Sequence, residues 1–163
     1  MWLGLNLITA IIASSAIDIF RDTLEQLVAL AVLMPIVASM GGVAASQTLT
    51  IVLRGLTLEQ ISNSNLGWLF KRELAVSILN GIVLSLIISL VTYFWFNQII
   101  LSILIAAAMI INLLSSVVAG VFVPVILRRL NQDPAIAGSV IVTTVTDVVG
   151  FVSFLGLATI FLL

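Results

Sequence analysis

Cysteine and histidine are both absent from the sequence. Their absence excludes disulfide scaffolds, thiol chemistry, zinc and haem ligation, and every catalytic triad that depends on histidine. Charged residues are also scarce, at 8% of the chain with a net charge of −1, whereas ordinary proteins contain about a quarter charged residues. This shortage excludes a nucleic-acid binder and a disordered tail. Because the chain has no cysteine sulfur or histidine nitrogen to offer, any ion that it binds is held by oxygen atoms.

Hydrophobic residues, in contrast, make up 62% of the chain, and the mean hydropathy is +1.35. A soluble domain does not sustain this composition, so the sequence predicts a membrane protein. A helix needs roughly 20 apolar residues to cross about 30 Å of hydrocarbon. The apolar runs are continuous and rich in Leu, Ile, Val and Ala, which favours an all-α fold. We predict a single transmembrane domain over residues 1–163, with five spans at about 2–20, 27–54, 74–96, 98–127 and 134–163, and an interfacial connection at 55–73.

Basic residues are unevenly divided between the predicted connections. Five of them lie between spans two and three or between spans four and five, whereas Arg21 lies on the opposite side beside acidic residues. Because cytoplasmic loops carry the excess of Lys and Arg, we predict that the N-terminus is inside and the C-terminus is outside. The five residues are Arg54, Lys71, Arg72, Arg128 and Arg129.

Asp147 is the clearest polar residue inside a predicted span. It lies about 20 Å from the start of the fifth span at Pro134, at a rise of about 1.5 Å per residue. A charged Asp at mid-helix costs about 2.5 to 3.5 kcal/mol on insertion scales, so it normally faces a cavity, a partner or a substrate path. Its alternative role is a hydrogen bond that holds the helices together. Helical spacing places Thr143, Thr144 and Gly150 on the same side of the helix, which makes them candidates for lining a pore.

Two other spans contribute polar or small candidates. The fourth span has Asn112 near mid-membrane, and Ser116 follows one turn later on the same stripe. The second span has Gly42 and Gln47 within a stretch rich in Gly, Ala and Ser. Residues of this kind either line a pore or form helix–helix contacts, and the residues alone leave both roles open.

Acidic residues also flank the spans. Asp133 precedes Pro134, so it is favoured as the cap of the fifth helix, and a role at the inner mouth of a pathway is the alternative. Asp18, Asp22 and Glu25 lie between the first two spans. They form either a solvated loop or an outer mouth whose negative field raises the local cation concentration.

Several short motifs, from the second predicted span to the fifth, form a recognisable set. They occupy residues 33–35, 41–42, 47, 54–56, 124–129, 133–135 and 143–150. This set resembles the membrane domain of the MgtE magnesium channel family, and the resemblance covers essentially the whole chain. It implies a homodimer of five-helix subunits, a cation pathway on the twofold axis, and magnesium binding by Asp147.

The sequence also departs from the pattern of that family. Where the family usually has Gly-Asn-x-Gly-x-Gln, residues 42–47 have Val43 in place of the Asn and Ala45 in place of the second Gly. A polar pore group is therefore missing, and the resemblance leaves the cation selectivity open. It covers the transmembrane domain alone, whereas most members also have cytoplasmic N-terminal and cystathionine-β-synthase-type regulatory domains.

We expect passive conduction of a hydrated divalent cation, with Mg²⁺ as the transported ion, by a homodimer that crosses a prokaryotic inner or plasma membrane several times. Mg²⁺ loses water reluctantly and is held through water and one or two carboxylates, which two Asp147 residues across a twofold axis provide. The alternatives are a proton- or sodium-coupled carrier and a non-conducting membrane subunit. We expect neither an organic cofactor nor a nucleic-acid partner. Enzymatic activity is not expected either, because intramembrane aspartyl catalysis needs two deep carboxylates in one site.

Overall fold

Six α-helices make up the described part of the protein. The computed structural model describes residues 2–62 and 65–162, and within these ranges it contains no β-strand. This confirms the predicted all-α fold. Four of the helices are long and apolar enough to cross a membrane, and the first is a shorter apolar helix. They are α1 (Trp2–Asp18), α2 (Arg21–Gln26), α3 (Val28–Thr57), α4 (Leu66–Phe96), α5 (Ile99–Arg129) and α6 (Pro134–Leu162).

The connection predicted at 55–73 is shorter in the structure. Helix α3 continues to Thr57, and α4 already begins at Leu66. Leu66, Leu69 and Phe70 recur at the spacing of one helix face, and they pack against side chains of α3 and α5. The span predicted from residue 74 therefore belongs to a helix that begins earlier, and the point where this helix enters a membrane stays a prediction. The prediction searched for runs of uncharged residues, and such a run cannot extend through Lys71, Arg72 and Glu73, although the helix includes all three.

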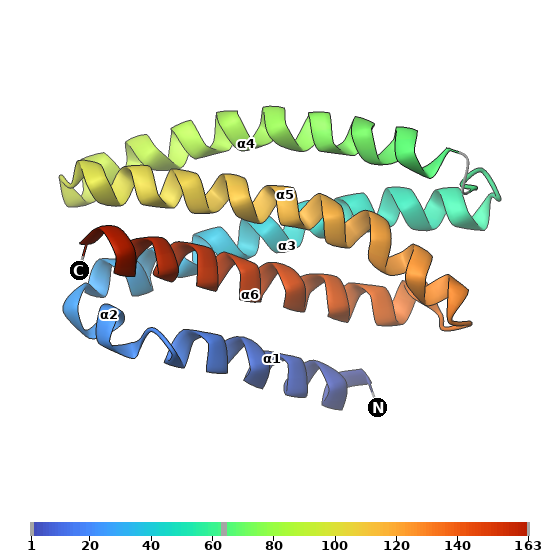
Figure 1. The fold of residues 1–163 in the computed structure, drawn as a ribbon, viewed down its shortest axis with the longest axis horizontal. Helices are drawn as coiled ribbons and strands as arrows, with labels where there is room; N and C mark the ends of the chain where they lie inside the picture. The colour runs from blue at the N-terminus through green and yellow to red at the C-terminus, as the bar shows by residue number, and fades with distance from the viewer. Residues whose placement is uncertain (1, 63–64, 163) are drawn as a thin grey trace.

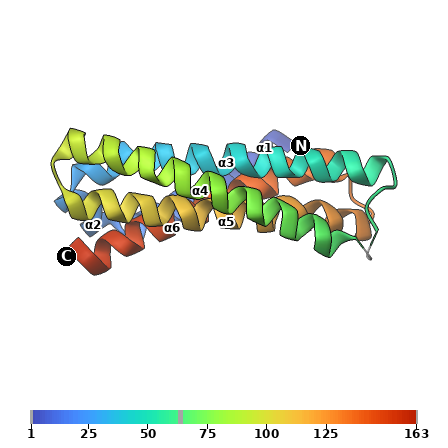
Figure 2. The same ribbon diagram turned by 90° about the horizontal axis from the view of Figure 1, so that it is seen from above.

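Helix α5 occupies the centre of the bundle. It packs against α3, α4 and α6, whereas α4 packs mainly against α5. The short α1 lies against α6, so α1 and α4 form opposite edges of the bundle (Figure 1). The long helices all run along the long axis of the molecule (Figure 2). Helix α1 has 17 residues, which is about 25 Å at 1.5 Å per residue, so its crossing of a membrane stays a prediction.

Small residues let the central helices approach closely. A Cβ atom added at Gly120 of α5 would lie 2.7 Å from Thr48 Cβ and 3.0 Å from the Ala45 carbonyl oxygen of α3. Backbones that approach in this way gain van der Waals contact, which is a principal source of helix association in a lipid environment. The contact therefore fixes α3 against α5, and with it the position of the residues on the other faces of α3.

The outward face of α4 is apolar and exposed. Its large side chains, among them Leu79, Leu86 and Phe94, are more than half accessible in the isolated chain. A soluble monomer rarely exposes an apolar surface of this extent. The exposure fits a helix whose outer face meets lipid or another membrane-embedded subunit.

Candidate functional site

A groove lies between α3 and α6. Its volume is about 480 Å³, and it is shallow and widely open. Asp147 is the charged residue of this groove, and the surrounding positions are small or hydroxyl-bearing. We call it the α3–α6 groove. The lining residues are Ala38, Ser39, Gly42, Val43, Ser46, Gln47 and Thr50 from α3, and Thr143 and Asp147 from α6.

Asp147 is a partly exposed carboxylate near the middle of α6. Among the residues that the structure describes, it has no hydrogen-bond or ion-pair partner, and the lining of the groove contains no Lys or Arg. A mid-helix carboxylate without a protein partner is costly unless water, a proton or a cation meets it. The alternative role of Asp147, a hydrogen bond to a neighbouring helix, is absent from the described part of this subunit.

Two adjacent threonines of α6, Thr143 and Thr144, differ in whether they line the groove. Thr143 lines the groove one turn before Asp147, whereas Thr144 does not. The Thr143 hydroxyl donates to the Ser139 carbonyl oxygen at 2.8 Å, and the Thr144 hydroxyl donates to the Val140 carbonyl oxygen at 2.7 Å. Because each hydroxyl hydrogen is used within the helix, the oxygen lone pairs of Thr143 are left to accept hydrogen bonds from water in the groove.

The opposite wall of the groove contains two residues expected from the sequence and three that sequence reasoning missed. Gly42 and Gln47 were expected, and both line the groove. Ser39, Ser46 and Thr50 were missed, although their separations of seven and four residues place them on the same helix face. The hydroxyls of Ser46 and Thr50 donate to carbonyl oxygens of α3 at 2.8 Å, so their lone pairs also face the groove as acceptors.

The two departures from the family pattern fall in different places. Val43 lines the α3–α6 groove and is 51% exposed. Ala45 is fully buried, and it packs against Ala119 and Val142 in the interior. The replacement at residue 43 therefore changes the surface of the groove, whereas the replacement at residue 45 changes helix packing.

Asn112 lies in the interior and does not line the groove. It is fully buried, and its Nδ2 atom donates to the Val37 carbonyl oxygen at 2.8 Å. A Cβ atom added at Gly41 or at Gly150 would lie 2.2 Å or 2.8 Å from the same Nδ2 atom, so these two glycines form the slot that holds the amide. Ser116 donates to the Gly41 carbonyl oxygen at 2.8 Å. Asn112, Ser116 and Gly150 therefore connect α3, α5 and α6, which is the helix-contact role that the sequence left open.

The other acidic candidates lie away from the groove. Asp133 Oδ1 accepts a hydrogen bond from the Ala135 backbone N–H at 2.9 Å, so it caps α6 as the sequence favoured. Asp18 accepts a hydrogen bond from Arg21 Nε at 3.1 Å, and this bond raises the pKa of the Arg21 guanidinium. Asp18 and Glu25 line a hollow beside α2, while Asp22 is exposed.

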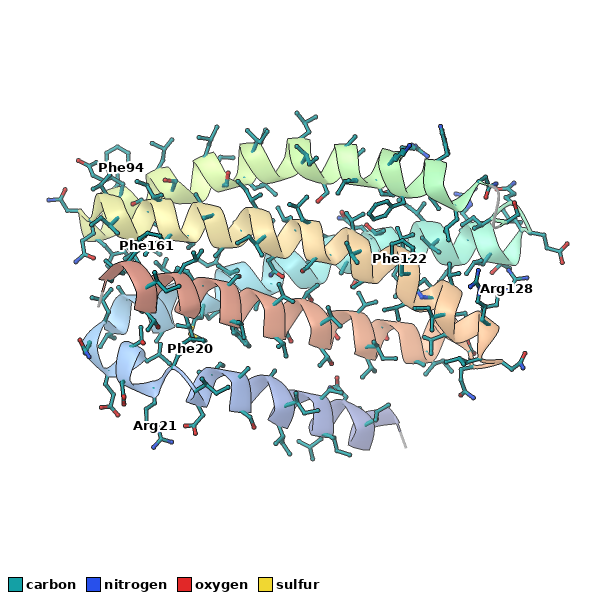
Figure 3. The ribbon with its side chains drawn as sticks, in the orientation of Figure 1. Phe20, Arg21, Phe94, Phe122, Arg128 and Phe161 are labelled. Carbon is teal, nitrogen blue, oxygen red and sulfur yellow. The ribbon has the colours of Figure 1, made fainter. Side chains whose placement is uncertain are left out.

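Charged side chains lie at both ends of the bundle. Arg21, with the acidic residues of the α1–α2 region, lies toward the end opposite Arg128 (Figure 3). Arg128 donates to the Leu56 carbonyl oxygen at 2.8 Å, near the C-terminal end of α3. A cation in this position is favourable because the last carbonyl groups of a helix carry partial negative charge.

The chain contributes a single carboxylate to the α3–α6 groove. Residues 2–62 and 65–162 contain no group of three or more acidic side chains that could hold a metal ion. An ion in the groove would thus be held by Asp147, by water, and by hydroxyl and amide oxygens. The fold and the groove define a helical membrane protein with an acidic, water-accessible groove.

The family follows from the comparison with known proteins. The family model for MgtE, described as a divalent cation transporter, matches residues 34–157, which include both walls of the groove. The chain belongs to this family, and the resemblance seen in the sequence is confirmed.

Three relatives are each named magnesium transporter MgtE. The protein of Bacillus subtilis is 36% identical over 161 residues, which are 99% of this chain and 36% of that protein. The protein of Thermus thermophilus is 28% identical over 96% of this chain and 35% of its own length. The protein of Enterococcus faecalis is 26% identical over 99% of this chain and 36% of its own length. The chain thus spans about a third of the length of these relatives.

Proposed function

We propose that this chain forms the membrane pathway of a magnesium channel. In this proposal a hydrated divalent cation, Mg²⁺, passes along the α3–α6 groove of two subunits in a cell membrane that the chain crosses several times. The observation that carries the proposal is the unpaired Asp147 carboxylate, which lines a groove whose other polar groups offer oxygen lone pairs. The names of the relatives support magnesium as the ion.

A homodimer completes the pathway. The α3–α6 groove is shallow and widely open and contains one carboxylate per subunit. Oligomers of identical chains most often have twofold symmetry, so a second copy facing the groove closes it and brings a second Asp147 to the axis. Mg²⁺ is commonly held by one or two carboxylates with several retained waters. Two copies therefore provide the carboxylate number that a hydrated Mg²⁺ requires.

Transport of the hydrated ion agrees with the lining of the groove. Ser39, Ser46, Thr50 and Thr143 present hydroxyl oxygens, and Gln47 presents an amide. These groups suit hydrogen bonds from the water shell of an ion, and the described lining contains no positive charge that would repel it. Transport, rather than catalysis, is the chemistry that such a surface supports.

The distribution of charge sets the orientation in this proposal. The basic residues near the ends of α3 and α5 place those ends in the cytoplasm, which puts the N-terminus inside and the C-terminus outside. Asp133 then lies at the inner side of the membrane. Asp18, Asp22 and Glu25 lie at the outer side, where their negative field attracts cations from solution.

Flux measurements in liposomes test the proposal against its alternatives. Mg²⁺ uptake by the purified, reconstituted chain is measured with and without a proton or a sodium gradient. A channel gives uptake that follows the Mg²⁺ gradient alone. Uptake that requires a proton or sodium gradient would establish a coupled carrier, and no uptake by a folded, reconstituted dimer would establish a non-conducting subunit. Glu59→Gln, an exposed acidic position outside the groove, controls for a general loss of negative charge.

A further inference from the structure

A second groove lies on the other side of α3. It has a volume of about 520 Å³ and separates α3 from α4, with α5 as its floor. The two walls make little direct contact with one another, since α4 packs mainly against α5. We call it the α3–α4 groove. Its polar lining residues are Gln47, Thr48, Glu73, Ser77 and Asn80.

Glu73 is the charged residue of this groove. The residue is only 8% exposed, and it lies in the first third of α4. Within residues 2–62 and 65–162 it has no hydrogen-bond or ion-pair partner, and the groove lining there includes no Lys or Arg. The adjacent Arg72 is exposed, and its guanidinium lies 5.9 Å from the centre of the Trp68 ring instead. Glu73 is thus a largely buried residue whose carboxylate lacks a compensating protein charge.

Other oxygen atoms lie along the groove near Glu73. Glu73, Ser77 and Asn80 follow one another at helical spacing on one face of α4. The Ser77 hydroxyl donates to the Leu113 carbonyl oxygen of α5 at 2.9 Å, which leaves its lone pairs free to accept. Helices α3 and α4 run in opposite directions (Figure 1), and Gln47 of α3 lines the same groove as Ser77 of α4. The groove therefore offers a carboxylate, two hydroxyls and two amides.

We propose that the α3–α4 groove binds a hydrated divalent cation, with Glu73 as the anionic ligand and the amides of Gln47 and Asn80 in contact with its water shell. A buried charge is stable when an opposite charge compensates it, and hard cations select oxygen ligands. This site differs from the α3–α6 groove in its carboxylate and in its second wall, which is α4 instead of α6, whereas α3 forms a wall of both. Val43 and Gln47 line both grooves, and Gln47 is the polar residue that the two sites share.

Calorimetry with Mn²⁺ as the probe tests the number of sites. The reconstituted chain is titrated as wild type, Glu73→Gln, Asp147→Asn and the double variant, with Glu59→Gln as the matched control. We expect Glu73→Gln to remove one class of sites and to keep the class that depends on Asp147, and Asp147→Asn to do the reverse. Equal Mn²⁺ binding by wild type and Glu73→Gln would overturn the proposed site in the α3–α4 groove. If only Asp147→Asn lost binding, the site in the α3–α4 groove would be excluded, and the pathway proposed for the α3–α6 groove would stand.

Spin labels locate the bound ion, and the absence of native cysteine makes single labelling straightforward. A nitroxide at Ile82→Cys on α4, outside the lining of the α3–α4 groove, is compared with one at Val145→Cys on α6. We expect Mn²⁺ to broaden the signal at residue 82, and Glu73→Gln but not Asp147→Asn to abolish that broadening. Broadening that survives Glu73→Gln would overturn the assignment of the ligand.

A milder variant keeps the test independent of folding. Asn80 is exposed at the groove, so Asn80→Ala removes an amide without placing a new group in the interior. We expect a threefold to tenfold weaker Mn²⁺ affinity, with a circular dichroism spectrum equal to that of the wild type. Unchanged affinity would exclude Asn80 from the site.

Infrared spectroscopy distinguishes a bound cation from a bound proton at Glu73. A protonated-carboxyl band that disappears in Glu73→Gln and does not change when Mn²⁺ is added would show that a proton, instead of a cation, neutralises Glu73. This result would overturn the proposal.

Discussion

Two polar regions of the molecule differ in whether their groups have partners. In the interior, the Asn112 amide is bonded to Val37 and enclosed by Gly41 and Gly150. In the α3–α6 groove, the Asp147 carboxylate has no partner among the described residues. The two residues cannot be told apart by their position along the sequence, since both lie near the middle of a long apolar helix. The difference teaches that a polar residue in a membrane helix is interpreted from the satisfaction of its hydrogen bonds as well as from its depth.

The largest expected effect comes from closing the interior slot. Gly41→Val places a side chain where the Asn112 amide now lies, because a Cβ atom there would be 2.2 Å from Nδ2. We expect overpacking and an unpaired amide to destabilise the fold by about 3 to 5 kcal/mol. Thermal unfolding in detergent measures the loss. The adjacent Gly42→Ala is the control, because a Cβ atom there meets no other group within 4 Å; equal stability of the two variants would contradict the slot.

Removing the interior amide itself has a smaller effect. Asn112→Ala removes the bond to Val37, and we expect a loss of about 1 to 2 kcal/mol in unfolding free energy. Because Asn112 is fully buried outside the groove, Mg²⁺ flux per folded dimer stays within twofold of the wild type. Both quantities are measured on the same preparation. A selective loss of flux with unchanged stability would place Asn112 in the pathway after all.

The paired threonines of α6 sharpen the comparison within one helix. Thr143→Val removes a hydroxyl that lines the groove, whereas Thr144→Val removes one that does not. A net hydrogen bond is worth about 0.5 to 1 kcal/mol, so we expect Thr143→Val to reduce Mg²⁺ flux by about twofold to fivefold. Thr144→Val serves as the control and keeps the wild-type flux. The assignment of Thr143 to the pathway fails if both variants conduct equally.

The smallest expected effect concerns selectivity. Val43→Asn adds an amide to the wall of the groove, where the side chain is already exposed. The fold therefore tolerates the change, and we expect the preference for Mg²⁺ over Ca²⁺ to rise by about twofold to threefold, which corresponds to less than 1 kcal/mol. Competition between the two ions during liposome uptake measures it. Ala45→Gly is the companion variant, and an equal gain in selectivity there would contradict the distinct locations of the two residues.

Much of the fold could be predicted from the sequence because apolar runs of sufficient length specify helices in a membrane. The last helix was predicted in this way, and its cap at Asp133 was predicted because Asp133 directly precedes Pro134. The start of α4 was not, because residues 66–73 mix a helical apolar face with three consecutive charged residues. The burial of Glu73 escaped prediction for the same reason, since a charge at the end of an apolar run is expected to be solvated.

The candidate site was predictable where spacing along one helix decides it. Thr143 lies one turn from Asp147, and helical spacing correctly places both on one face, although the same spacing also favoured Thr144 and Gly150, which do not line the groove. The sequence could not decide between the groove and the interior for Asn112, because the slot depends on Gly41 and Gly150 from two other helices. Contacts of that kind join residues 75 positions apart in the chain, and no local pattern encodes them.

The most direct test of the central claim is Mg²⁺ flux through reconstituted wild type, Asp147→Asn and Asp147→Glu. A charged hydrogen-bond acceptor is worth about 1.5 to 3 kcal/mol, so Asp147→Asn should lower flux at subsaturating Mg²⁺ by about tenfold to a hundredfold. Asp147→Glu, which keeps the charge, should retain more of the flux than Asp147→Asn. The account is contradicted if a folded Asp147→Asn dimer conducts Mg²⁺ as well as the wild type.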